Sequence, residues 1–486
     1  MTPDDFNERF LPPPSGHDES LHKSVWTESK KLWVVAGPAI FTRFATIGVQ
    51  GITQAFLGHV GATELAAYAL SSSVIDRIAA GILLGMASAL ETLCGQSFGA
   101  KQYHMLGIYL QRSWIILLAT TIIILPLFLF TSPLMLLLGQ NPLISNVAGL
   151  VSLWFIPVVF SNVFSFTFQM YLQSQSKNSV ISYFSLISIT LHVLLSWVSV
   201  IKLQWGISGA MGSMAIALWI PVIGQFAYVL CGGCPETWKG FTWSAFTDLW
   251  HIIKLSLSSG AMICLELWYG SILVLLTGYM ENAEVALDAL SICLNISVWE
   301  MMISLGFLAA AGVRVANELG AGNAKAAKFS IVVVTVTSTF IGCAVILIFL
   351  CFRLSIVYLF TTSDAVADAV LDMTPLLVLN LFLNSIQPVL LGAAVGAGWQ
   401  NIVAYVNIAC YYFVGIPVGV ILGYLTGYGV KGIWMGMNFG TLIQTLVLLF
   451  ITWKIDWDRE VAIAKARVNK WFLPESKETS HKNEGI

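Results

Sequence analysis

The sequence predicts an all-α integral membrane protein with twelve transmembrane helices, arranged as two related sets of six. Hydrophobic residues make up 57% of the 486-residue chain and charged residues only 10%, whereas a soluble chain carries about a quarter charged residues. Apolar segments of about 20 residues, long enough to cross a bilayer as helices, recur along almost the whole sequence. The second half of the chain also repeats features of the first, at an offset of about 220 residues.

Each expected helix is a mostly apolar run of membrane-spanning length. The first six are predicted near residues 32–56, 65–92, 113–138, 147–172, 178–201 and 207–231. The second six are predicted near residues 252–278, 285–311, 329–360, 371–394, 402–424 and 430–453.

These runs divide the chain into an N-lobe (32–231), a linker (232–251) and a C-lobe (252–453). The polar tails, 1–31 and 454–486, are expected to be solvated. Most basic residues near the helix ends fall on one side of this arrangement, including Lys30, Lys31, Lys101, Arg112, Lys177, Lys239, Lys254, Arg314, Lys325, Lys328, Lys454 and Arg459. Since cytoplasmic loops carry the excess of Lys and Arg, the linker and both termini are expected to be cytoplasmic.

The internal repeat is carried by glycines at matched positions. Gly85-Met-Ala-Ser-Ala-Leu90 corresponds to Gly306-Phe-Leu-Ala-Ala-Ala311, and Gly99 corresponds to Gly320. Because each half contains an even number of helices, the two halves have the same orientation and form a parallel repeat about the membrane normal. Transporters with such repeats bind substrate between the halves, near the middle of the bilayer.

Several motifs resemble those of plant multidrug and toxic compound extrusion (MATE) transporters. They are Leu90-Glu-Thr-Leu-Cys-Gly-Gln96, Tyr103-His-Met-Leu-Gly-Ile-Tyr-Leu-Gln-Arg112, Cys264-Leu-Glu-Leu-Trp-Tyr269, Arg314-Val-Ala-Asn-Glu-Leu-Gly320 and Gly398-Trp-Gln-Asn401. The resemblance covers about residues 30–460 and implies a V-shaped fold with helices 1–6 in one lobe and 7–12 in the other.

The resemblance also implies a function. Relatives export or sequester small organic compounds, such as secondary metabolites and xenobiotics, by cation antiport, and plant members usually couple to protons. We therefore expect a monomeric proton antiporter in the vacuolar or plasma membrane, with lipid and a small organic substrate as its partners. An enzyme, a cofactor and a nucleic-acid partner are not expected. Cys231-Gly-Gly-Cys234 has metal-ligand spacing but lacks a second ligand pair, so no metal site is predicted.

Two acids are candidates for proton coupling. Glu266 stands in the middle of an apolar segment, where a charge costs about 2.5–3.5 kcal/mol on insertion scales, and it matches the acid of the family's helix 7 motif. Glu300 also falls inside the bilayer and is expected to share a cavity with it. The alternative is a structural role for both acids, for example a hydrogen bond between Glu266 and Tyr269.

The candidate substrate contacts are mainly neutral polar residues. Asn384 stands where many plant relatives have an acid, and its amide binds no proton, so it is expected to hydrogen-bond substrate together with Tyr269. Thr53 stands where prokaryotic relatives often have Asp, which disfavours an acidic cation site in the N-lobe. The N-lobe candidates for lining a substrate cavity are Gln50, Gln54, Asn162, Gln169, Gln173 and His192. Alternatively, each makes an ordinary interhelical hydrogen bond.

Further charges within the membrane helices are assigned gating or structural roles. Arg43 and Asp76 are expected to pair, leaving Arg77 as a surplus cation, although anion binding by these arginines is equally compatible with the sequence. Ion pairs that close the cytoplasmic side are expected from Glu91, Arg112, Arg314 and Glu318. The arginines, together with Asn384 in place of an acid, support one alternative function, an anion channel or anion transporter on the same scaffold.

Overall fold

The computed structural model describes residues 21–278, 280 and 284–470. Within these residues the regular structure is entirely helical, and twelve helices are long and apolar enough to cross a membrane. The predicted all-α class and helix count are therefore confirmed. The outer parts of the two predicted tails, residues 1–20 and 471–486, lie outside the described residues.

The first six spans come from the following elements: α2 (Leu21–Val60), α3 (Ala62–Ser71) continued by η1 (Ser72–Asp76) and α4 (Arg77–Gly99), α5 (Tyr103–Leu129), α7 (Pro142–Ser174), α8 (Asn178–Ser196) continued by η2 (Trp197–Lys202), and α9 (Gly206–Tyr228) continued by η3 (Val229–Gly233). Two short helices, α6 (Thr131–Leu137) and η4 (Trp243–Phe246), lie in connections.

The second six spans come from these elements: α10 (Leu249–Gly278), α11 (Glu284–Gly320), α12 (Ala324–Tyr358), α13 (Asp364–Asn384) followed by α14 (Gln387–Ala397), α15 (Gln400–Asn407) continued by η5 (Ile408–Gly415), α16 (Ile416–Val420) and η6 (Ile421–Leu425), and α17 (Gly429–Lys454). A final helix, α18 (Trp457–Lys470), follows the last span.

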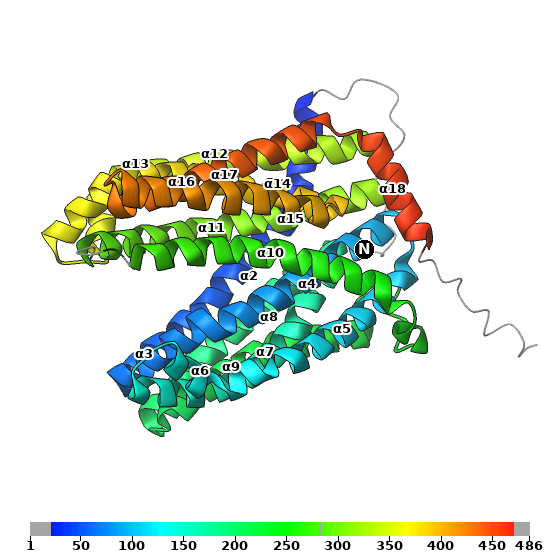
Figure 1. The fold of residues 1–486 in the computed structure, drawn as a ribbon. Coiled ribbons are helices and arrows are strands. Elements are labelled where there is room, and N and C mark those ends of the chain that lie inside the picture. Colours follow the sequence, from blue (N-terminus) through cyan, green and yellow to red (C-terminus); the bar gives the residue numbers. More distant parts are fainter. Residues whose placement is uncertain (1–20, 279, 281–283, 471–486) are drawn as a thin grey trace, which may run out of the picture.

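The helices form two lobes that diverge at the end carrying α3 and α13 and converge at the end carrying α18 (Figure 1). The V shape expected from the family resemblance is therefore present. We call the narrow end, where α4, α11, α14 and α18 meet, the convergent end.

The first helix of each half packs across the boundary between the lobes. Leu32 and Val35 of α2 belong to a buried cluster with Phe307 and Val389 of the C-lobe, whereas the later part of α2 packs on α8 of the N-lobe. Helix α2 also begins at Leu21, well before the predicted residue 32. The division at residues 32–231 stays a prediction, and the structure adds that the first helix contacts both lobes.

The seventh span repeats this arrangement in the other direction, since α10 packs on α4 of the N-lobe. The matched glycines explain how these helices come so close. A Cβ on Gly85 would lie 2.7 Å from Cα of Gly260 in α10, and a Cβ on Gly306 would lie 3.2 Å from the carbonyl oxygen of Ala36 in α2. The repeat found in the sequence therefore corresponds to a repeated helix contact in three dimensions.

The prediction of a solvated C-terminal tail is wrong for residues 457–470, which form α18. Trp457, Val461, Ala464 and Val468 are all buried against the C-lobe. Their spacing of three to four residues is that of an amphipathic helix, a signal that the many charged residues of this segment obscured. Its Arg467 reaches the N-lobe, and burial lowers the pKa of this guanidinium, an effect that Glu460 opposes.

Candidate functional site

The tenth membrane span is broken near its middle. Helix α13 ends at Asn384 and α14 begins at Gln387, and Pro388 in the first turn of α14 cannot donate a backbone hydrogen bond. Ser338 of α12 donates to the carbonyl oxygen of Ser385 over 2.7 Å, which satisfies one backbone acceptor within the break. The break is therefore a supported feature that exposes polar groups among apolar helices.

Glu266 of α10 lies on one side of this break. The amide nitrogen of Gln387 donates a hydrogen bond of 2.8 Å to its Oε1 atom. The carboxyl group is half-buried, whereas the Gln387 side chain is buried. Gln387 also stands at the N-terminus of α14, where the helix dipole favours a negative charge. Sequence reasoning found Glu266 but missed Gln387, for which the Gln-Pro pair inside an apolar span was the available signal.

Glu300 of α11 lies on the other side of the break and is buried. Its Oε1 atom accepts a hydrogen bond of 2.7 Å from Ser304, one turn further along the same helix. Its Oε2 atom has no hydrogen-bond partner, and Asn384 is its polar neighbour at the break. Glu266 and Glu300 thus flank one break, the first beside Gln387 and the second beside Asn384.

Tyr269 makes packing contacts and no hydrogen bond to Glu266. Its hydroxyl donates to the carbonyl oxygens of Met437, at 3.0 Å, and Gly436, at 3.2 Å. Its ring stacks on Tyr411 with centroids 4.1 Å apart and planes inclined by only 8°. The alternative of a Glu266–Tyr269 hydrogen bond is therefore wrong. This geometry also supports a packing role for Tyr269 over a substrate contact.

The neutral polar residues of the N-lobe do not line one common cavity. Gln50 and Gln54 are exposed on α2, whereas Gln173 is buried in α7. His192 is fully buried and lies 3.0 Å from the hydroxyl of Thr53, so these two residues form an interhelical hydrogen bond. Two of the predicted residues, Asn162 and Gln169, do line an N-lobe cavity. Its full lining is Thr42, Arg43, Ala45, Thr46, Val49, Ser161, Asn162, Ser165, Phe166, Gln169, Ile181, Ser185, Ser188, Leu218, Pro221 and Gln225.

The expected pair between Arg43 and Asp76 is wrong. Among the described residues no ion pair involves either side chain, and the Oδ1 atom of the buried Asp76 has no hydrogen-bond partner. Arg77 is exposed. The acid that acts electrostatically on Arg43 is Glu91, although these two groups form no ion pair either. Adjacency of helices 1 and 2 in the sequence did not determine which faces of the two helices meet.

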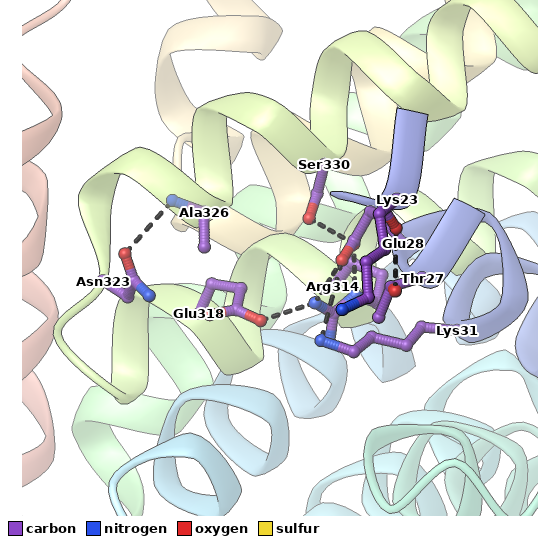
Figure 2. Close-up of polar contacts among 9 residues, drawn as sticks. All are labelled: Lys23, Thr27, Glu28, Lys31, Arg314, Glu318, Asn323, Ala326 and Ser330. Atoms are coloured by element: carbon purple, nitrogen blue, oxygen red, sulfur yellow. Dashed lines mark hydrogen bonds and ion pairs between the residues drawn. The ribbon is translucent and has the colours of Figure 1, made fainter. Parts of the chain in front are cut away.

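Only part of the expected ion-pair set forms at the convergent end (Figure 2). Arg314 of α11 makes two hydrogen bonds to Glu28 of α2, of 2.8 and 3.1 Å, and one of 2.5 Å to Glu318. Ser330 of α12 donates to the same Glu28 carboxylate. Glu28 was missed because residues 1–31 were assigned to a polar tail. Its contacts join α2, α11 and α12.

The matched N-lobe residues behave differently. Arg112 donates to the carbonyl oxygen of Ser244 at 3.0 Å and to the Thr247 hydroxyl at 3.3 Å, so it braces the linker and does not pair with Glu91. Glu91 is buried where α4 meets α11, and its Oε1 atom has no hydrogen-bond partner. A Cβ on Gly312 of α11 would lie 2.0 Å from that atom. The Glu91 carboxyl group therefore packs in the space, or notch, that the missing side chain of Gly312 leaves.

Polar contacts between the lobes close the convergent end. Gln96 of α4 donates to the carbonyl oxygen of Gly396 in α14 at 3.0 Å and accepts a bond of 2.8 Å from Arg467 of α18. Thr92 donates to the carbonyl oxygen of Val395 at 2.5 Å and accepts from Gln400 at 2.8 Å. We call these contacts the seam. The two lobes are therefore joined at the convergent end, whereas the candidate site at the helix break is built from C-lobe helices alone.

Comparisons with known proteins agree with this architecture. The MatE family model matches residues 38–198 and 259–421. Protein DETOXIFICATION 20 of Arabidopsis thaliana is 58% identical over 460 residues, covering 95% of this chain and 94% of its own length. Protein DETOXIFICATION 27 of the same plant is 48% identical and covers 93% of both chains.

Solved structures show the same fold. The crystal structure of the eukaryotic MATE transporter AtDTX14 superposes with a TM-score of 0.86 at 32% identity, covering 91% of this chain and 99% of that one. The Vibrio cholerae MATE transporter VcmN superposes with a TM-score of 0.80 at 15% identity, covering 90% and 100%, a likeness of fold alone. With two lobes, twelve spans and a family model matching both halves, the chain belongs to the MATE family of membrane transporters.

Proposed function

We propose that this protein exports or sequesters small organic compounds in exchange for protons, and that Glu266 and Glu300 carry the coupling. The observation that carries this proposal is the hydrogen bond from Gln387 to Glu266 at the break in the tenth span. It links an acid inside the membrane to a point where a helix is already interrupted.

Protonation of Glu266 changes the strength of this link. A hydrogen bond to an ionised carboxylate is roughly twice as strong as one between neutral groups. A proton on Glu266 therefore weakens the tie between α10 and the start of α14. The α13–α14 break is then free to change its angle, which couples proton binding to the shape of the C-lobe.

Glu300 and Asn384 form the second part of the proposed site. Glu300 offers a buried carboxyl oxygen without a hydrogen-bond partner, next to the Asn384 amide. Because the amide can donate and accept at once, Asn384 can bridge this acid and a polar substrate group without holding a proton. We propose Asn384 as the principal substrate contact, and Gln50, Gln54 and Gln173 remain predicted contacts. Of the other two predicted contacts, Tyr269 has hydrogen bonds that favour a packing role, and Asn162 lines the small N-lobe cavity.

The proposed orientation places the convergent end in the cytoplasm. The beginning of α2 and the helix α18 both lie there (Figure 1), as do many of the basic residues that follow the positive-inside rule. The divergent end then faces the vacuolar lumen or the cell exterior. We propose a monomer in the vacuolar or plasma membrane, since all residues of the proposed coupling site come from one chain.

The test is transport by purified protein in liposomes with an imposed pH gradient. Uptake of a fluorescent alkaloid and of a flavonoid glycoside is measured, together with proton efflux reported by an internal pH dye. We expect gradient-driven uptake and coupled proton efflux in the wild type and neither in Glu266→Gln. Asp288→Asn, which removes an exposed acid on α11, is the matched control and should transport normally. Uptake that ignores both the gradient and Glu266→Gln would refute proton coupling at this site.

The alternative function is an anion channel on the same scaffold, which the replacement of an acid by Asn384 favours. Planar-bilayer recordings separate the two functions. Voltage-dependent anion currents far above carrier turnover would establish the channel. Coupled uptake without such currents would establish the antiporter.

A further inference from the structure

An internal cavity of about 70 Å³ lies inside the N-lobe, between α2, α7, α8 and α9. It is separate from the break in the C-lobe that carries the proposed coupling site. Its lining is unusually polar for the interior of a membrane lobe, because hydroxyl and amide side chains make up more than half of it. One lining residue, Arg43, is charged.

Most of the hydroxyl groups around the cavity are already used. Thr42, Ser161 and Ser185 donate to carbonyl oxygens of their own helices over 2.7–2.9 Å. Ser188 donates to the carbonyl oxygen of Ala217, which has no helical partner because the residue four positions later is a proline. Because these hydroxyl groups already donate to backbone carbonyl oxygens, they are not available to donate to a ligand in the cavity.

A second set of lining side chains has unused hydrogen-bonding capacity. Arg43 Nε, Gln169 Nε2 and Gln225 Oε1 are buried and have no hydrogen-bond partner. The side chains of Asn162 and Ser165 make no hydrogen bond to any part of the chain that the structure describes. A terminal amide can rotate to present either its oxygen or its NH₂ group, so all five side chains can donate toward the cavity.

The charge around the cavity is positive. No acid lines it within the described residues, and no described acid forms an ion pair with Arg43. Glu91 acts on Arg43 only at longer range and lies in its own notch at the seam. An uncompensated charge inside a membrane protein is costly and normally has a partner. An anion in the cavity that Arg43 lines would be such a partner.

The size of the cavity limits the partner to a small ion. A cavity needs about 10–15 Å³ of such space to hold one water molecule, so this one accommodates about five waters, or one small ion together with a few waters. Pockets for drug-sized molecules are about 300–1,000 Å³, so an organic substrate of that size does not fit. We propose that the N-lobe cavity is a binding site for a small monovalent inorganic anion such as chloride or nitrate, held by Arg43 and by the amide and hydroxyl donors of Gln169, Asn162 and Ser165. This inference does not rest on proton coupling at the C-lobe break.

The test is equilibrium binding of radioactive chloride to the full-length protein, purified in a buffer with gluconate as the only anion. We expect one saturable chloride site per chain, competed by nitrate and not by gluconate, which is too large for the cavity. In Arg43→Gln the chloride affinity should fall by about tenfold or more, because a charge-assisted hydrogen bond contributes at least that much. Arg353→Gln, which removes an exposed arginine from α12, should bind chloride like the wild type.

Two further variants keep the test decisive if Arg43→Gln fails to fold. Gln169→Leu removes an uncommitted donor and should weaken chloride binding, while Glu91→Gln removes the acid that competes for Arg43 and should strengthen it. Opposite shifts in these two variants would support the site. Absence of saturable chloride binding in the wild type would overturn it and mean that water alone solvates Arg43. Unchanged affinity in Arg43→Gln, or in both Gln169→Leu and Glu91→Gln, would likewise overturn it.

Discussion

Replacing Gly320 with alanine should open the convergent end of the protein. A Cβ at this position would lie 2.0 Å from the carbonyl oxygen of Gln96 and 2.9 Å from its Cα. Favourable contact distances between such atoms are about 3.5 Å, so the two helix backbones must separate by about 1 Å or more. The obstacle is backbone, which cannot swing aside as a side chain can. The clash is relieved only by moving α11 away from α4, which strains the seam that the same Gln96 helps to form.

The size of the effect follows from the cost of overpacking, typically about 1–3 kcal/mol. In the proposed antiport cycle the convergent end opens and closes, so this cost falls on the closed state alone, and the ratio of open to closed molecules should rise by about 5–150-fold. Spin labels at Lys101→Cys and Lys325→Cys, exposed sites just beyond the ends of α4 and α11, report the seam by pulsed electron resonance. The exposed cysteines, Cys231 and Cys351, are first replaced by serine.

Two further variants test this prediction, a control without a clash and a substitution on the opposite helix of the same contact. Gly51→Ala adds the same methyl group to a helix where nothing lies within 4 Å of the new atom, so its distance distribution should match the parent. Gly99→Ala should act like Gly320→Ala, because its Cβ would lie 2.0 Å from the carbonyl oxygen of Asn317. An unchanged distance distribution in Gly320→Ala would refute the reasoning.

The remaining predictions concern stability, read as thermal unfolding midpoints in detergent. Arg314→Met should be severely destabilising, by about 3–5 kcal/mol, because it leaves the Glu318 carboxylate buried without its cation and Glu28 with only Lys31, at 3.8 Å; a midpoint close to that of the wild type would contradict this. Ser188→Ala should cost about 1–3 kcal/mol, because it strands a buried α9 carbonyl oxygen. Ser258→Ala should be close to neutral, because its half-buried hydroxyl bonds only to the carbonyl oxygen of Lys254 in its own helix; equal losses in the two variants would refute the role of Ser188. Tyr269→Phe should cost about 1 kcal/mol of stability, seen as a lower unfolding midpoint, and should leave the transport KM unchanged. A raised KM with unaltered stability would instead support Tyr269 as a substrate contact.

The sequence predicted the spans, the repeat and the two membrane-embedded acids because each depends on local composition or on spacing along the chain. Apolar runs identify helices wherever they pack, and the isolation of Glu266 among apolar residues is visible without a structure. The glycines at matched positions of the two halves likewise indicated a repeated feature, which the structure identifies as a close contact between helices.

The partners of the charged side chains could not be predicted in the same way. Whether Arg43 meets Asp76 or faces a cavity depends on the rotation of α2 about its axis, which tertiary packing sets. Glu28 was hidden because its polar neighbours mimic a solvated tail, although a buried arginine from the other half of the chain binds it. The Gln387–Glu266 contact joins residues far apart in sequence, and no local pattern records it.

The exchange of first helices between the lobes has a consequence for how the protein is made. The buried apolar cluster that Leu32 and Val35 of α2 join is completed by residues of α11, α12 and α14, which are synthesised some 300 residues later. During synthesis this apolar surface therefore waits for partners from the C-terminal half. The two six-helix halves are therefore not autonomous folding units: a fragment that ends at the linker should be recognised by quality control and degraded, and co-expression of the missing half should rescue it.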